Sequence, residues 1–230
     1  MKGLAGTVME RLVAAFEPHR DPTRAAQMSA YLREQFPFLG IMKTERVALM
    51  REALAGLDRP TELDLAAVAA ACWKRPEREY QYAGAWFLRR HARILGPGFI
   101  GDAERLIVTK SWWDTVDDLA ANVVGSLVRA HELGGEMDRW IGSANFWLAR
   151  AAILHQLRYR AGTDDVRLFG YCRRRGSDTE FFIRKAIGWA LREYTKTDHR
   201  GVLAFLREHG AELSPLSRRE AVKWIEASRS

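Results

Sequence analysis

The 230-residue sequence has little of what marks a membrane, secreted or zinc-binding protein. No run reaches the roughly 18 apolar residues that a membrane-spanning helix requires. The first residues are charged and lack a small-residue cleavage pattern, so we expect no secretory signal. The two cysteines, Cys72 and Cys172, are too few for a disulfide framework and are not spaced as zinc ligands. We therefore expect buried thiols in a cytoplasmic protein that binds no membrane.

Signatures of cofactor chemistry are also missing. The chain has no Walker phosphate loop and no glycine-rich dinucleotide motif following a strand. The six histidines are dispersed along the sequence, and we expect most of them at the surface. These absences argue against a nucleotide-dependent or metal-dependent enzyme, and we expect no cofactor.

Helical periodicity is present almost everywhere. Apolar residues recur at three- and four-residue steps, as in Leu65, Val68, Ala69 and Cys72, and no stretch alternates convincingly between apolar and polar residues. Helix starts are marked by two N-caps that precede proline and by three pairs with capping-box spacing. The N-caps are Asp21 and Ser214, and the pairs are Ser111 with Asp114, Ser177 with Glu180, and Ser217 with Glu220. The sequence predicts an all-α protein of about a dozen helices.

A faint repeat organises these helices. Trp113, Trp147 and Phe181 follow one another at steps of 34 residues, and each begins a predicted helix. The predicted helices are Trp113–Ala130, Trp147–Arg158 and Phe181–Tyr194. Repeats of about this length with two helices per unit are typical of HEAT or armadillo α-solenoids. We therefore predict one domain over residues 1–230, a curved α-solenoid of HEAT-like repeats with a concave face.

Positive charge is concentrated in one part of the chain. The formal net charge is +7, and the segment Phe146–Arg200 holds twelve Lys and Arg residues against six Asp and Glu residues. A basic cluster of this kind suits a polyanion, of which nucleic acid is the commonest, although a solvated helical face can also be basic. We expect the concave face to be basic and to bind DNA.

The string Lys110-Ser-Trp-Trp-Asp-Thr-Val-Asp-Asp118 stands out for its paired tryptophans and its acids. Ser111 and Asp114 have capping-box spacing, whereas Trp113 and Asp117 are four residues apart and share one helix face. An indole beside a carboxylate forms a good pocket for a cation. The alternative is that the tryptophans fill the core and the acids only complement the helix dipole.

Two further strings carry candidate residues: the second spans residues 145–156 and the third spans residues 180–197. Arg150 lies in the middle of a mostly apolar predicted helix, so it requires a protein carboxylate or a ligand phosphate as its partner. In the third string, Gly188 permits close backbone packing, Trp189 and Arg192 share a face, and Lys196 follows one turn later.

At these three strings the sequence resembles the AlkD type of bacterial DNA glycosylase, which is built from HEAT-like repeats. The resemblance extends to four further stretches, so it spans nearly the whole chain. These stretches are 28–31, 38–41, 76–79 and 215–221. It implies a monomeric enzyme that releases N3- and N7-alkylated purines, such as 3-methyladenine and 7-methylguanine, from double-stranded DNA without flipping the base.

The resemblance also implies roles for individual residues. Asp117 corresponds to the catalytic acid, Trp113 and Trp189 flank the deoxyribose of the lesion, and Arg150 belongs to the same site, where we expect it to hold a phosphate. Tyr31 matches a tyrosine that approaches the DNA backbone. Further DNA contacts are expected from the residues that adjoin these motifs: Lys110, Ser111, Trp112, Arg192 and Lys196. Ala149 departs from the family pattern, but both the acid and the arginine are present.

The implied chemistry fits these residues. An N3- or N7-alkylpurine already carries positive charge and leaves as a neutral base, so one carboxylate suffices where sugar hydrolases usually use two. No lysine aligns as a Schiff-base nucleophile, so we expect a monofunctional glycosylase. The alternative is a non-catalytic helical-repeat module that binds DNA or serves as a protein scaffold, because fold alone does not decide function.

Overall fold

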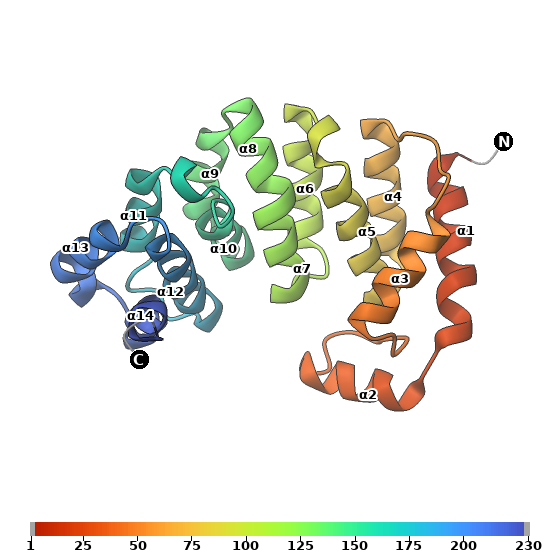
Figure 1. Cartoon of the computed structure of the whole chain (residues 1–230), viewed down its shortest axis with the longest axis horizontal. Helices are drawn as coiled ribbons and strands as arrows, with labels where there is room; N and C mark the ends of the chain where they lie inside the picture. Colours follow the sequence, from red (N-terminus) through yellow and green to blue (C-terminus); the bar gives the residue numbers. More distant parts are fainter. Residues whose placement is uncertain (1–2, 228–230) are drawn as a thin grey trace. The chain divides into compact units, whose positions relative to one another are not determined.

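The computed structural model describes residues 3–227, and every regular element in this range is a helix (Figure 1). This confirms the predicted all-α class. The chain divides into two compact units, residues 1–110 and residues 111–230. The single domain expected from the sequence stays a prediction.

The first unit is a stack of helices and short connecting turns. Helix α1 packs against α3 and α4, and α4 packs in turn against α5 and α6. The helices are α1 (Leu4–Phe16), α2 (Pro22–Tyr31), α3 (Lys43–Ala53), α4 (Glu62–Lys74), α5 (Arg78–Arg90) and α6 (Ile100–Val108).

The second unit carries the three helices that the sequence singled out. Helix α10 packs against α7, α9, α11 and α12, and α12 packs against α13 and most extensively against α14. The helices are α7 (Trp113–Asp118), α8 (Gly125–His131), α9 (Gly134–Ile141), α10 (Phe146–Leu154), α11 (Asp165–Arg174), α12 (Phe181–Thr195), α13 (His199–His209) and α14 (Pro215–Ala227). A π-helical segment, Leu119–Val124, joins α7 to α8.

The proline-associated helix starts are confirmed. The side chain of Asp21 accepts a hydrogen bond from the Arg24 amide, and Ser214 Oγ accepts one from the Ser217 amide. The capping-box pairs built on Ser177 and Ser217 are wrong. Glu180 is itself the N-cap of α12. Helix α14 begins at Pro215, before Ser217, because proline preorganises the first helical turn.

Contacts at a nearly constant sequence separation connect neighbouring helices of the second unit. Tyr159 Oη donates to the Gly125 carbonyl over 34 residues, and Tyr171 Oη donates to Asp138 over 33 residues. Ser217 Oγ donates to the Arg184 carbonyl, again over 33 residues. The 34-residue step in the sequence thus reappears as a spacing between residues that touch.

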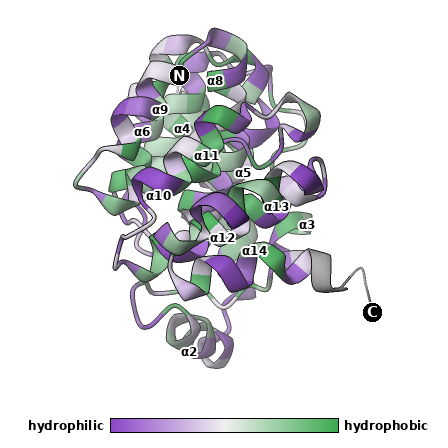
Figure 2. Ribbon diagram, turned by 90° about the vertical axis from the view of Figure 1, so that its left-hand side faces the viewer, coloured by the Kyte–Doolittle hydropathy of each residue, from purple (hydrophilic) through white to green (hydrophobic). Residues whose placement is uncertain are grey.

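Most helices bury one face, so hydrophobic and hydrophilic residues alternate along most ribbons (Figure 2). Both cysteines are buried free thiols, as the sequence predicted, and burial raises the pKa of Cys72 to about 12. His155 departs from the expected surface position, because it is buried and its Nδ1 lies 2.7 Å from the Ala152 carbonyl.

Within residues 3–227, no helix combines the length and apolar character needed to cross a membrane.

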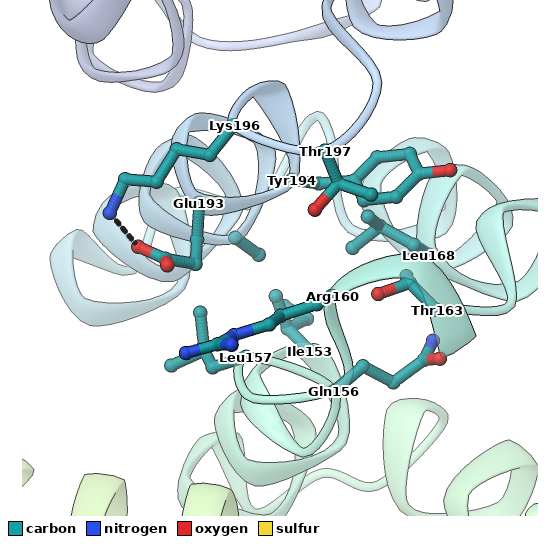
Figure 3. Close-up of a pocket in the computed structure, with 11 residues that line it drawn as sticks. Ile153, Gln156, Leu157, Arg160, Thr163, Leu168, Glu193, Tyr194, Lys196 and Thr197 are labelled. Atoms are coloured by element: carbon teal, nitrogen blue, oxygen red, sulfur yellow. Dashed lines mark hydrogen bonds and ion pairs between the residues drawn. The ribbon is translucent and has the colours of Figure 1, made fainter.

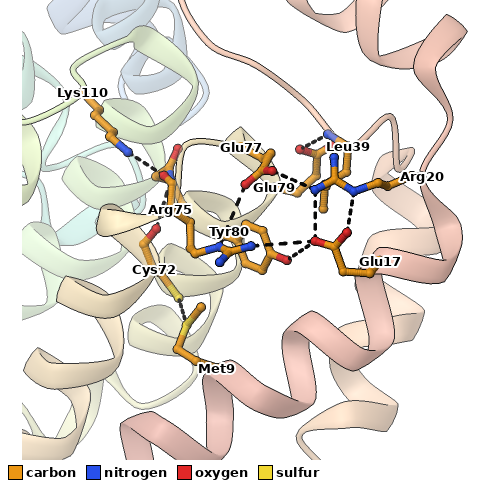
Figure 4. Close-up of polar contacts among 11 residues, drawn as sticks. Met9, Glu17, Arg20, Leu39, Cys72, Arg75, Glu77, Glu79, Tyr80 and Lys110 are labelled. Atoms are coloured by element: carbon orange, nitrogen blue, oxygen red, sulfur yellow. Dashed lines mark hydrogen bonds and ion pairs between the residues drawn. The ribbon is translucent and has the colours of Figure 1, made fainter.

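Two of the four shorter stretches that carry the resemblance, 38–41 and 76–79, meet inside the first unit. The buried carboxylate of Glu79 accepts hydrogen bonds from the amides of Leu39, Gly40 and Ile41, with the Leu39 amide at 2.9 Å (Figure 4). Nearby, Arg20 is paired with Glu77 at 2.8 Å. The strings near residues 40 and 79 therefore maintain the fold of this unit.

Candidate active site

Helix α7 carries the candidate acid. The helix begins at Trp113, and Trp112 occupies the N-cap position in an extended conformation without a side-chain cap hydrogen bond. The predicted capping box, with Ser111 as the N-cap, places the start one residue too early. Trp113 and Asp117 are still one helical turn apart, so their side chains lie on one face as predicted.

The carboxylate of Asp117 is held by Arg150 from α10. Arg150 Nε donates to Oδ1 at 2.7 Å, and Nη2 donates to Oδ2 at 2.8 Å. The remaining nitrogen, Nη1, donates to the carbonyl of Phe182 on α12. Arg150 is 3% exposed, so its guanidinium is committed to protein partners. In this structure its partners are groups of the protein, and the phosphate contact expected for Arg150 stays a prediction.

Burial and ion pairing act in opposite directions on Asp117. Burial raises the pKa of the Asp117 carboxyl above its ordinary value, because a charged group loses hydration there. The two hydrogen bonds and the positive charge of Arg150 oppose this shift. A bidentate guanidinium also fixes the orientation of both carboxylate oxygens. Arg150 thus supports the ionised form of Asp117, which burial disfavours.

A hollow of about 310 Å³ lies in front of this pair. It is lined by residues of α7, α10 and α12, namely Trp113, Asp117, Arg150, Phe181, Phe182, Lys185, Trp189 and Arg192. Five of these were predicted from the sequence, and the structure brings those five together in one place. The hollow therefore combines a carboxylate, two indoles and the partly exposed cations Lys185 and Arg192.

Sequence reasoning did not assign Phe181, Phe182 and Lys185 to the site. Phe181 is 50% exposed and occupies the same step of the repeat as Trp113, which is the signal that could have identified it. Lys185 precedes Trp189 by one turn and so shares its helix face. The role of Phe182 depends on its carbonyl, for which side-chain patterns give no signal.

Two cations at the hollow are held by one buried acid of α14. Glu220 pairs with Lys185 at 2.8 Å and with Arg192 at 2.7 Å, and it also bonds Lys223. Burial by itself would raise the pKa of Glu220, but the ammonium groups of Lys185 and Lys223 lower it to about 2. Glu220 therefore fixes where the positive charge at the hollow lies.

Gly188 makes this arrangement possible. A Cβ atom at residue 188 would lie 2.4 Å from the Cβ of Glu220 and 2.8 Å from the Ser217 carbonyl oxygen. Helices α12 and α14 can therefore approach closely only where α12 has no side chain. This confirms the close backbone packing predicted for Gly188.

An aromatic cluster forms the support behind the site. The ring of Trp112 packs against Trp147 and Phe182, with centroid distances of 5.8 and 5.2 Å. Its indole Nε1 is buried without a hydrogen-bond partner. Trp112 is not among the residues that line the hollow. Its indole therefore takes part in helix packing, and the DNA contact expected for Trp112 stays a prediction.

Helix α7 continues directly into the π-helical segment Leu119–Val124. Asn122, in this segment, donates through Nδ2 to the Asp118 carbonyl at 3.0 Å and to Asp118 Oδ1 at 2.6 Å. Single π-helical turns inside α-helices are frequent at functional sites. The segment begins two residues after Asp117, the candidate acid.

Other predicted contacts are located elsewhere. Tyr31 ends α2 and is 74% exposed. The ammonium group of Lys110 donates to the Arg75 carbonyl at 2.5 Å (Figure 4), and burial lowers its pKa. Both residues belong to the first unit. Lys196 lies just beyond α12 and pairs with Glu193 at 2.6 Å, whereas Ser111 directly precedes the Trp-Trp pair. None of these residues lines the hollow.

The site contains no recognisable ligand set for a metal. Across residues 3–227, no group of three or more His, Cys, Asp or Glu side chains is arranged to bind a metal ion.

Two comparisons with known proteins found a match. A family model described as DNA alkylation repair enzyme matches residues 12–225. The chain is also similar to a solved structure from Enterococcus faecalis described as a predicted DNA alkylation repair enzyme. The two are 34% identical with a TM-score of 0.82, over 89% of this chain and 96% of the other. The comparison with curated proteins gave no match.

Proposed function

Because the chain belongs to the DNA alkylation repair enzyme family, we propose that it is a DNA glycosylase for cationic alkylated purines. It would hydrolyse the N-glycosidic bond of N3- or N7-alkylpurines in duplex DNA. The observation that carries this proposal is the Asp117 carboxylate, held by Arg150 at a hollow that Trp113 and Trp189 also line.

The reaction builds positive charge on the deoxyribose as the bond to the base lengthens. A carboxylate fixed beside the sugar stabilises this charge, because the dipoles and charges of a preorganised site need no rearrangement during the reaction. Asp117 would also orient the attacking water. The alkylated base leaves as a neutral molecule, so the mechanism requires no general acid.

Arg150 would act through Asp117 rather than on the DNA. Its fork-like pairing fixes both oxygens of the acid and supports the ionised form, which is the form that stabilises a cation. We therefore replace the phosphate-binding role expected from the sequence with a positioning role. The hydrogen bond to the Phe182 carbonyl extends this support to α12.

The two tryptophans would complement the carboxylate. An indole face attracts a cation by about 0.5–2 kcal/mol, depending on how well water is excluded. Trp113 and Trp189 come from different helices, so they can flank a sugar that lies against Asp117. Phe181, which is half exposed at the same hollow, would add apolar contact.

Lys185 bears on whether the DNA strand is also cut. A glycosylase that cleaves the strand uses a neutral amine to form a Schiff base. The ammonium group of Lys185 is paired with Glu220 at 2.8 Å, and a protonated amine has no lone pair for this attack. We propose a monofunctional enzyme that leaves the strand intact.

The proposal also covers the overall architecture of the helices and the way the DNA is bound. We propose that the helices form a HEAT-like solenoid whose basic concave face holds the duplex, and that the base is not flipped out. The recurring contacts at separations of 33 and 34 residues support a repeat architecture. A scaffold without catalysis would have no need of a buried bidentate Asp–Arg pair at an open hollow.

The test is release of 7-methylguanine from a duplex that carries one such base. Wild-type protein should release the base and leave an alkali-labile site in an otherwise unbroken strand. Asp117→Asn should lose most of this activity, whereas Asp114→Asn provides a matched acid on the same helix that does not line the hollow. Intact substrate after incubation with excess wild-type protein would refute the proposal.

A further inference from the structure

Three hollows adjoin one another in the second unit. The hollow of the active site and a second one, of about 360 Å³, are both lined by Asp117 and Trp189. The second and a third, of about 370 Å³, are both lined by Leu157 and Glu193. Helix α12 contributes to each of the three. The hollows therefore follow one another along α12, away from Asp117, and we refer to this row of three hollows as the trough.

Charge changes sign along this trough. The active-site end has the cations Lys185 and Arg192. The middle hollow has three carboxylates and one cation, namely Asp117, Asp118, Glu193 and Arg158. The far end has Arg160 and Lys196 (Figure 3). Cations at both ends with carboxylates between them match a DNA strand whose lesion is cationic and whose flanking phosphates are anionic.

Arg160 differs from the other cations at the two ends of the trough. Lys185 and Arg192 pair with Glu220, and Lys196 pairs with Glu193. The guanidinium of Arg160 has no hydrogen bond or ion pair within residues 3–227, and in Figure 3 it extends across Leu157 beneath the Lys196–Glu193 pair. It is the cation at this end that no acid neutralises.

The backbone at Arg160 also departs from the ordinary. Its φ angle is 53°, in the left-handed region that favours glycine. Strained residues of this kind cluster at functional sites, where the side chain is needed in a particular place. The strain and the unpaired guanidinium are independent observations on the same residue.

Hydroxyl groups complete the far hollow. Thr163, Tyr194 and Thr197 line it, and their side-chain oxygens make no hydrogen bond with any described residue. A guanidinium with adjacent hydroxyl donors suits a phosphate group, whose oxygens accept several hydrogen bonds. The floor is apolar, with Ile153 and Leu168, so water competes less well for these donors.

We propose that the hollow at Arg160 binds a backbone phosphodiester of the DNA strand whose lesion lies at Asp117. This inference rests on the proposed function. Lys196 is seven residues beyond Trp189, a rise of about 10 Å along a helix at roughly 1.5 Å per residue. One strand has a phosphate about every 3.4 Å of duplex axis, so the bound phosphate lies about three nucleotides from the lesion.

The experiment measures binding rather than catalysis. A series of duplexes carries a stable abasic analogue and one neutral methylphosphonate at each successive position. Wild-type affinity should fall roughly tenfold when the phosphate about three nucleotides to one side of the lesion is neutralised. Arg160→Asn removes the guanidinium and tolerates the left-handed backbone, so it should abolish this position-specific loss. Its salt dependence should be shallower by about one unit of slope.

Arg207→Ala is the matched control, because Arg207 is an exposed arginine of the same unit that lines none of the three hollows. It should keep the wild-type profile and slope. An Arg160→Asn protein with an unchanged profile would overturn the inference. Binding of inorganic phosphate that depends on Arg160, without a positional effect in DNA, would also overturn it. Base release at saturating protein is a separate readout, so either proposal can fail alone.

Discussion

Arg150 and Asp117 face each other across 33 residues of sequence with two parallel hydrogen bonds, Nε to Oδ1 at 2.7 Å and Nη2 to Oδ2 at 2.8 Å. Both side chains are largely withdrawn from solvent, so each is the other's main source of electrostatic compensation. Breaking one member of such a buried pair leaves an uncompensated charge, which costs about 3–5 kcal/mol.

Asp117→Asn should slow release of 7-methylguanine by about a hundredfold, because it removes a charge stabilisation of roughly 3 kcal/mol. The structure adds an expectation that the sequence did not provide, namely that the same variant is less stable, because Arg150 stays charged. Single-turnover release and urea unfolding measure the two effects separately.

The double variant Asp117→Asn with Arg150→Gln separates catalysis from folding. Removing both charges should recover much of the lost stability while leaving activity low, so the stability effects of the single variants should not add. Recovery of activity together with stability would mean that Asp117 acts only on the fold.

Arg150→Lys should move the acid limb of the pH–rate profile to higher pH. Burial raises the pKa of Asp117, and the arginine opposes that rise through two fixed hydrogen bonds. Lysine retains the positive charge but cannot make the two parallel hydrogen bonds of the guanidinium. The pKa of Asp117 therefore rises further, and the active ionised form is lost at a higher pH. The profile of single-turnover rate against pH checks this, and an unshifted acid limb would exclude Arg150 as the group that supports ionisation.

Neutral lesions should be poor substrates. If the charge on the alkylated base provides the leaving-group activation, uracil or hypoxanthine should be released slowly or not at all. Parallel single-turnover assays on a uracil duplex and a 7-methylguanine duplex make the comparison. Equal rates would require a general acid that the hollow does not contain.

Glu220→Gln should destabilise the protein at neutral pH. The folded-state pKa of Glu220 is about 2, below the ordinary value near 4.5. At pH values above about 4.5, the ionised carboxylate therefore contributes about 3 kcal/mol to the free energy of unfolding. This contribution is lost as the pH falls from about 4.5 to about 2. Urea unfolding at pH 7 and at pH 2.5 should therefore show a large difference from wild type at the first pH and a small one at the second.

The sequence predicted the helices, and Trp113 with Asp117 on one helix face, because both depend on local spacing. The meeting of Trp189 with these two residues was implied by the resemblance to a family, because it depends on how α7 and α12 are placed in the fold. The partner of Arg150 could not be chosen between a carboxylate and a phosphate, because the pairing depends on how α7 and α10 pack. The start of α7 was misplaced for a similar reason, since the aromatic packing of Trp112 competes with the predicted cap.

The π-helical segment after Asp118 means that the site depends on the number of residues in the chain as well as on their identity. A π-helical turn accommodates one residue more than an α-helical turn, and one residue corresponds to about 100° of rotation in an α-helix. Gly125 is fixed beyond the segment, because a Cβ there would lie 2.3 Å from the His155 carbonyl oxygen. A one-residue deletion within Leu119–Val124 would therefore restore a regular helix and rotate Asp117 away from Arg150. Relatives that differ by one residue in this segment would present the acid in another direction even where every motif residue is retained.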